Sequence, residues 1–363
     1  MSSIEIPAMQ SAPRGEVVAT KIGVGFVLVL ILLGMPLVIP EYQTFQLTGV
    51  MTYAVAALGL NLITGYVGQV SLGHNAFFAL GSYAAVLSVV YLGVNDVVAV
   101  LIAAVVTFIF GVLAGYPAKR LRGLYLALIT LVLAVSVVPL VKQFKAYTGG
   151  AAGLMVDKPV PPAWFTLGQD AWIYYMVLAF TLVIFWLVRN FVGGSNGRAL
   201  AGIRESELAA SSMGVDVNRL KVIVFGVGSM LAGVGGALAT FTIGFIGPDS
   251  FTLMLSISFL AAIVVGGLGT IWGALVAGLF LQFVPSYASD LGQAFSGAVY
   301  GGILIACMTL MPNGIVGSLL KIASNRREAR KAADRTAGKG AEKTTVAEKT
   351  TVKAAADRTA RAT

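Results

Sequence analysis

The chain contains ten long stretches of mostly apolar residues, and none of them carries Asp, Glu, Lys or Arg. Charged residues make up 11% of the sequence and hydrophobic residues 57%, whereas soluble domains carry about 25% charged residues. A helix of about 20 apolar residues crosses the hydrocarbon core of a bilayer. The sequence therefore predicts an all-α polytopic membrane protein with about ten transmembrane helices. The predicted spans are residues 23–40, 47–65, 70–92, 97–117, 124–141, 172–188, 222–246, 253–267, 270–285 and 293–311.

The stretches 253–267 and 270–285 have two interpretations. They are short, and the glycine-rich break from Gly266 to Gly269 separates them. They form either two complete spans or a re-entrant hairpin near 253–285. Both alternatives return the chain to the same side of the membrane by Pro285.

The positions of the cations predict the orientation, because cytoplasmic loops are enriched in Lys and Arg. Ten crossings place four cationic groups on one side, the cytoplasm, together with both termini. The longest external loop, Lys142–Asp170, contains three exceptions to this rule at Lys142, Lys145 and Lys158. The four cytoplasmic groups are Arg14 and Lys21; Lys119, Arg120 and Arg122; Arg189, Arg198, Arg204, Arg219 and Lys221; and the tail.

Three regions differ in composition. Residues 1–21 form a polar cytoplasmic leader, and residues 22–320 form the transmembrane domain. Residues 321–363 hold most of the formal net charge of +9 and contain Ala-Glu-Lys-Thr-Thr-Val twice, at 341–346 and 347–352. This tail has no hydrophobic period and cannot bury a core, so we expect a basic, disordered cytoplasmic extension. The charge therefore does not indicate nucleic-acid binding.

The spans offer little chemistry of their own. His74 is their notable titratable group, and ion-coupled carriers usually keep a buried acidic or basic residue. The sequence has no Gly-x-x-x-x-Gly-Lys-Ser/Thr loop for nucleotide phosphates. Cys307 is the sole cysteine, which excludes an intrachain disulfide and a multi-cysteine metal site. We expect no cofactor, no metal and no catalytic residue, and the energy for any uphill transport must come from another chain.

The segment 197–221 is the longest polar stretch between spans. Alternating intervals of four and three predict one helix whose small, mostly apolar face holds Ala199, Ile203, Ser206, Ala210 and Met213. Gly214 should end this helix, and Asp216 should cap a second short helix through Lys221. Such a unit suits docking in another protein's groove. The alternative is an amphipathic connector on lipid headgroups.

The segment 59–85 interrupts its apolar background with polar residues and glycines. Non-helical backbone at membrane depth is tolerated where protein or a water-filled cavity satisfies it. We therefore expect a bundle interior or a solute path here. For His74 the alternative to solute contact is a structural hydrogen bond. The alternative for Asn61 and Thr64 is that their side chains form hydrogen bonds between helices. The candidate path residues are Asn61, Thr64, Gln69, Ser71, His74 and Asn75.

Five motifs in order resemble one family. They are Gly59-Leu-Asn-Leu followed by Gly68-Gln-Val-Ser-Leu-Gly-His-Asn-Ala-Phe-Phe-Ala-Leu-Gly-Ser-Tyr83, then Thr148-Gly-Gly-Ala-Ala-Gly-Leu154, Gly197-Arg-Ala-Leu-Ala-Gly-Ile-Arg-Glu-Ser-Glu-Leu-Ala-Ala210, Val265-Gly-Gly-Leu-Gly-Thr-Ile-Trp-Gly273 and Pro312-Asn-Gly-Ile-Val-Gly317. Across about residues 22–320 the chain resembles LivM-type permeases of branched-chain amino-acid ABC importers.

The resemblance implies a type II importer-like permease fold in the bacterial inner membrane. It also implies a related LivH-like permease subunit, two cytoplasmic ATPase subunits and an external solute-binding protein. Segment 197–221 then matches the family's ATPase-coupling region. We expect its partner-facing charges to be Arg204 together with Glu205 or Glu207, and its apolar anchors to be Ile203 and Met213. Arg198 and Gly214 complete the expected coupling set.

Other functions remain open from the sequence. Related permeases handle other amino acids, urea or short amides, so the solute is not fixed. A standalone channel or sodium-coupled carrier would work without an ATPase. An intramembrane enzyme would need a catalytic pair, which a lone His74 without a buried carboxylate does not supply.

Overall fold

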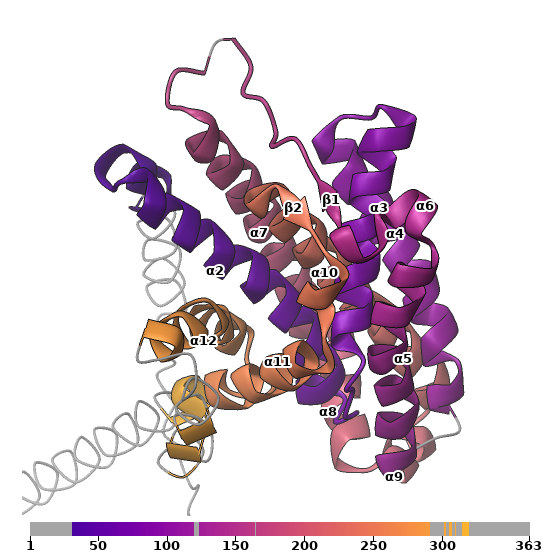
Figure 1. Ribbon diagram of the computed structural model, residues 1–363. Coiled ribbons are helices and arrows are strands. Elements are labelled where there is room, and N and C mark those ends of the chain that lie inside the picture. The colour runs from indigo at the N-terminus through magenta and orange to yellow at the C-terminus, as the bar shows by residue number, and fades with distance from the viewer. Residues whose placement is uncertain are drawn as a thin grey trace, which may run out of the picture.

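The computed structural model describes residues 31–119, 123–163 and 165–290, with short pieces between 301 and 318 (Figure 1). Residues 31–38 are helical, and the long helices that follow are α2 (Glu41–Leu60), α3 (His74–Leu92), α4 (Asp96–Gly115), α5 (Leu124–Gln143), α7 (Gln169–Gly193) and α10 (Val217–Ile243). The other helices are α6 (Lys145–Thr148), α8 (Ser195–Glu205), α9 (Glu207–Ser212), α11 (Leu253–Gly266) and the 20-residue α12 (Ile271–Asp290).

Helix α10 lies at the centre of the bundle and packs against α2, α3 and α4. Its glycines make this possible, because a Cβ on Gly228 would lie 2.7 Å from the backbone oxygen of Gly59 in α2. Gly226 meets Phe108 and Val112 of α4 in the same way. Small residues at such crossings let helix backbones approach closely. The small-residue spacings of the span 222–246, such as Ala232 to Gly236 and Gly233 to Ala237, predict this packing role from the sequence, and the structure confirms it.

Helices α4 and α5 form the periphery of the bundle, and fewer than a third of the residues in their apolar stretches are buried. The exposed side chains are apolar, among them Leu101 and Ile109 on α4 and Val132 on α5. A contiguous apolar surface of this extent is typical of a lipid-facing or subunit-facing helix.

Six helices of the described chain are long and apolar enough to cross a membrane. The total of ten stays a prediction, because residues 23–30 of the first expected span and most of the span expected at 293–311 fall outside the described residues. The leader 1–21 and the tail 321–363 lie outside them as well.

Several predicted boundaries are wrong. The span expected from residue 70 begins at His74, because the chain leaves the helix after Tyr66 and Gly68 has a positive φ of 78°. The span expected from 47 begins at Glu41, just after Pro40. It continues past Leu60 as a π-helix, η1 (Asn61–Tyr66).

Helices α11 and α12 form a hairpin with its tip at residues 267–270. The 14 residues of α11 give a length of about 21 Å, which is shorter than the hydrocarbon core of about 30 Å. Gly267 breaks the helix with a φ of 119°. The length of α11 is typical of a re-entrant segment, whereas the 20 residues of α12 are enough to cross the core. The choice between a re-entrant hairpin and two complete spans for 253–285 therefore stays a prediction.

The connection between α5 and α7 folds over one end of the bundle, which we call the sheet end (Figure 1). Strand β1 (Leu154–Met155) pairs antiparallel with β2 (Phe245–Ile246), with Leu154 opposite Ile246. The sheet end also contains two short 3₁₀ turns, η3 (Gly150–Ala152) and η4 (Pro248–Phe251). Helices α8 and α9 lie at the opposite end, which we call the α8–α9 end; a third 3₁₀ turn, η2 (Pro117–Lys119), follows α4.

Candidate functional site

The part of the polar segment 197–221 that precedes Gly214 forms two helices, where the sequence predicted one. Helix α8 stops at Glu205, and Ser206 caps α9 by accepting a hydrogen bond from the Ala209 backbone N–H at 3.3 Å. Serine favours this N-cap position because its hydroxyl satisfies a free N–H of the first turn. The prediction of one continuous helix through Met213 is therefore wrong, and the helix period restarts at Glu207.

The end of this segment agrees better with the sequence. Gly214 turns the chain after α9 with a φ of 84°, and Asp216 Oδ1 accepts a hydrogen bond from the Arg219 backbone N–H at 3.0 Å. The predicted stop and cap are thus confirmed. The capped helix is not a separate short one, however, because it is the first turn of α10 and continues to Ile243.

The break at Ser206 changes which side chains are presented. Ile203 and Ala210 are each 3% exposed and lie in the core of the chain, so Ile203 is not available as an apolar anchor and that expectation is corrected. Met213 is 86% exposed, as an anchor should be. Leu208, which the sequence pattern did not single out, is 74% exposed. A helical wheel restarted at Ser206 would have found it.

The expected coupling charges have different surroundings. Arg198 and Glu205 are exposed. Glu207 pairs with Lys221, whose side chain is 2% exposed, so this pair ties α9 to the start of α10. Arg204 Nη1 donates a hydrogen bond to the backbone oxygen of Gly65 at 2.6 Å. Glu207 and Arg204 are therefore engaged within the chain itself.

Asn61, the first of the expected path residues, is fully buried and joins η1 to the tip of the α11–α12 hairpin. Its Nδ2 donates to the backbone oxygen of Thr270 at 2.7 Å, and its Oδ1 accepts from the Gly269 backbone N–H at 2.9 Å. Both ends of the amide are thus used in holding the hairpin tip, which is the structural alternative for this residue.

Asn75 is a second structural amide. Its Nδ2 lies within hydrogen-bond distance of the backbone oxygens of Ala134, Phe251 and Thr252, at 2.9 to 3.2 Å. Its Oδ1 accepts from Ser256 Oγ at 2.7 Å. The side chain therefore connects α3 with α5, η4 and α11, and in this conformation it has no group left for a solute.

His74 makes the structural hydrogen bond that was one alternative for it. Its Nε2 lies 2.7 Å from the backbone oxygen of Ala56, and since a carbonyl only accepts, Nε2 is the donor. The ring meets Phe259 edge to face, with centroids 5.2 Å apart. Nδ1 is buried and has no hydrogen-bond partner within the described chain.

Of the remaining path candidates, Thr64 lies in η1, and Gln69 and Ser71 lie on the extended segment 67–73. Thr64 Oγ1 donates to the backbone oxygen of Gln69 at 3.0 Å. Gln69 and Ser71 alternate with the exposed residues Gly68 and Val70, as expected for an extended chain with one buried side. The Gln69 amide atoms and Ser71 Oγ are buried without partners in the described chain. Buried polar atoms without a protein partner are commonly satisfied by ordered water.

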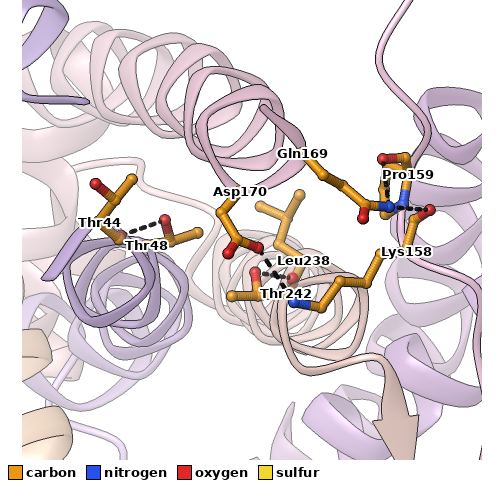
Figure 2. Close-up of polar contacts among 8 residues, drawn as sticks. All are labelled: Thr44, Thr48, Lys158, Pro159, Gln169, Asp170, Leu238 and Thr242. Carbon is orange, nitrogen blue, oxygen red and sulfur yellow. Dashed lines mark hydrogen bonds and ion pairs between the residues drawn. The ribbon is translucent and has the colours of Figure 1, made fainter. Parts of the chain in front are cut away.

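The sheet end is held by ion pairs that sequence patterns did not reveal. Lys158 Nζ lies 3.1 Å from Asp170 Oδ1, and Gln169 donates to the backbone oxygen of Lys158 (Figure 2). Thr48 and Thr242, drawn in the same view, each donate to a carbonyl one turn back in their own helices. The partly exposed polar groups of this region are therefore those of the ion pair, whereas the hydroxyls of Thr48 and Thr242 are used in hydrogen bonds.

Lys142, another exception to the predicted charge distribution, lies 2.8 Å from Asp249 Oδ1. Two of the three exceptional cations thus neighbour carboxylates at the same end of the molecule. In the described residues no group of three or more His, Cys, Asp or Glu side chains is placed to hold a metal ion. In the described residues the candidate site consists of packing surfaces, ion pairs and hydrogen bonds between helices.

Helices of this length around a glycine-rich core define a multi-pass membrane protein whose polar segments connect the helices. The family model for the permease component of branched-chain amino acid transport systems matches residues 44–308. The chain belongs to this family. It is accordingly a permease component rather than an enzyme.

Curated relatives agree with this assignment. The chain is 28% identical over 312 residues to the high-affinity branched-chain amino acid transport system permease protein LivM of Salmonella typhimurium, covering 80% of this chain and 73% of that protein. It is 27% identical to BraD, the corresponding permease protein of Pseudomonas aeruginosa, covering 73% and 92%. Identity to LivH of Escherichia coli is 24%, covering 73% and 91%. No solved structure matches the chain significantly.

Proposed function

We propose that this chain is the membrane-spanning permease subunit of an ATP-driven importer of branched-chain amino acids. The observation that carries the proposal is the family match over residues 44–308, supported by relatives named as permease proteins of high-affinity branched-chain amino acid transport systems. The chain would perform no covalent chemistry. It would convert motion imposed by another subunit into alternating access for the solute.

The partners follow from the surfaces and the relatives. LivM-like and LivH-like permeases both resemble this chain, which supports pairing with a related LivH-like subunit. Two cytoplasmic ATPase subunits would supply the energy, and an external binding protein would deliver the solute. We assign the ATPase contact to the surface of Leu208, Met213 and Glu205, which is exposed beside the α8–α9 turn.

The proposed orientation places the α8–α9 end in the cytoplasm and the sheet end outside. Arg189, Arg198 and Arg219 lie near the α8–α9 end, in agreement with the enrichment of cations on the cytoplasmic side. Both termini would be cytoplasmic in a type II importer-like fold with about ten spans. The protein would reside in the bacterial inner membrane.

The solute would pass along weakly polar surface at the contact with the second permease. Within this chain Asn61 and Asn75 are occupied by backbone groups, whereas Gln69, Ser71 and His74 Nδ1 keep unused polar atoms. We assign these three residues, with Thr64, to the polar lining near the path. Because no buried cation or anion faces them in the described spans, binding would be weak and selectivity would rest with the external protein.

ATP hydrolysis by the assembled complex in nanodiscs tests this function. The complex should hydrolyse ATP faster when its binding protein carries leucine, isoleucine or valine than when the binding protein is empty. Stimulation by urea or a short amide alone would move the solute assignment to the alternative class. A chain that assembles with no ATPase subunit would return the sodium-coupled carrier or channel to consideration.

A further inference from the structure

Three segments far apart in the sequence meet at the α8–α9 end. They are η1, the hairpin tip at residues 267–270, and the last turn of α8. Asn61 of η1 bonds to Gly269 and Thr270 of the tip, and Arg204 of α8 bonds to the Gly65 backbone oxygen. We call these five residues, Asn61, Gly65, Arg204, Gly269 and Thr270, the junction.

The junction has almost no free space. A Cβ on Gly65 would overlap Asn61 Oδ1 and the backbone nitrogen of Gly269. A Cβ on Gly269 would lie 3.0 Å from Arg204 Nη1, and Gly269 already has a φ of 75°. Close-packed groups transmit displacement because they cannot absorb it by compression. Movement of α8 would therefore reach the hairpin tip through η1.

Arg204 itself contributes little to the core. Its residue surface is exposed, so the fold does not depend on burying it. Its specific contact is the 2.6 Å hydrogen bond to Gly65. Gly65 lies in a π-helix, whose wider turns are often found at functional positions. The arginine thus joins an exposed surface helix to an irregular segment at the end of a buried span.

We propose that Arg204 is a positioning residue that transmits displacement of α8 and α9 to η1 and, through Asn61, to the tip of the α11–α12 hairpin. The inference rests on the proposed function, since the displacement would be imposed by the ATPase subunits. Docking would occur at Leu208 and Met213, beyond the break at Ser206. Arg204 would then carry the motion inward, rather than serving as a docking contact.

The test separates docking from transmission with three variants of the complete transporter in proteoliposomes. Arg204→Gln removes the cation but stays polar, Arg204→Lys keeps a charged donor, and Arg219→Gln is the control, an exposed arginine in the first turn of α10. For each variant the amount of bound ATPase subunit, the ATP hydrolysis rate and leucine uptake are measured together.

Arg204→Gln should retain ATPase binding and ATP hydrolysis, while uptake per ATP falls about tenfold, within the range of typical coupling between sites. Arg204→Lys should recover much of the coupling, and Arg219→Gln should match wild type. Normal uptake per ATP in Arg204→Gln would overturn the inference. So would a loss of ATPase binding that accounts for the lost uptake, because Arg204 would then be a docking contact. Failure of the proposed function would look different, since wild type itself would show no ATP-driven uptake.

Discussion

The two ends of the molecule are held together by different interactions. At the sheet end, long side chains reach across loops, as in the pairs Lys142–Asp249 and Lys158–Asp170. At the α8–α9 end, backbone groups approach directly at Gly65 and Gly269, and the short side chain of Asn61 bonds to the backbone. The ion pair at this end, Glu207–Lys221, is more buried than the two at the sheet end. Flexible ion pairs tolerate small displacements, whereas a tightly packed backbone contact does not. This difference indicates that the α8–α9 end transmits motion and that the sheet end holds a loop in place.

The largest effect should come from filling the space at Gly65. Gly65→Val would push η1 and the tip of the α11–α12 hairpin apart, because a side chain there overlaps Asn61 Oδ1 and the backbone nitrogen of Gly269. Overpacking commonly costs about 1–3 kcal/mol and occasionally more. We expect near-complete loss of uptake, measured in proteoliposomes, with reduced thermal stability. Gly193→Val is the control, since a Cβ at Gly193 would have nothing within 4 Å; equal uptake by Gly65→Val and this control would contradict the tight packing at Gly65.

Removing the carboxylate from the buried pair at the α8–α9 end should have the next largest effect. Glu207→Gln leaves Lys221, which is 2% exposed, without its counter-charge. Loss of one partner from a buried pair costs roughly 3 kcal/mol. Thermal unfolding in detergent should show this loss, and the double variant Glu207→Leu with Lys221→Met should recover most of it. An additive double variant would mean that the two residues act independently.

Polar replacement of the exposed apolar surface should weaken assembly without unfolding the chain. Leu208→Ser with Met213→Ser removes two side chains that are 74% and 86% exposed. We expect about a tenfold loss of ATPase affinity, a size typical of losing one or two interface anchors. Co-purification and titration measure it. Unchanged affinity would place the docking surface elsewhere on the α8–α9 end.

The smallest effect should come from the sheet end. Lys158→Gln breaks a pair whose side chains are 32% and 31% exposed. Such pairs contribute about 0–1 kcal/mol and are weakened by salt. Thermal stability should change little, and the difference from wild type should shrink further at high salt. A loss of thermal stability as large as that of Glu207→Gln would show that ion pairs at the sheet end stabilise the fold as much as the pair at the α8–α9 end.

Local signals in the sequence predicted local structure well. The cap at Asp216, the turn at Gly214 and the packing glycines of α10 follow from short-range chemistry and spacing. The break at Ser206 was missed because an unbroken spacing of apolar residues also fits one helix, and this placed Ile203 on the wrong side. The bond from Arg204 to Gly65 joins residues 139 positions apart. No periodicity encodes such a contact, which appears only when the helices are packed.

The most direct test of the proposed function is uptake of labelled leucine into proteoliposomes that contain this chain, its LivH-like partner, the ATPase subunits and the external binding protein. We expect leucine accumulation that requires ATP and the ATPase subunits, and that stops when either is left out. Leucine uptake by this chain alone, without ATP and without partners, would contradict the importer function.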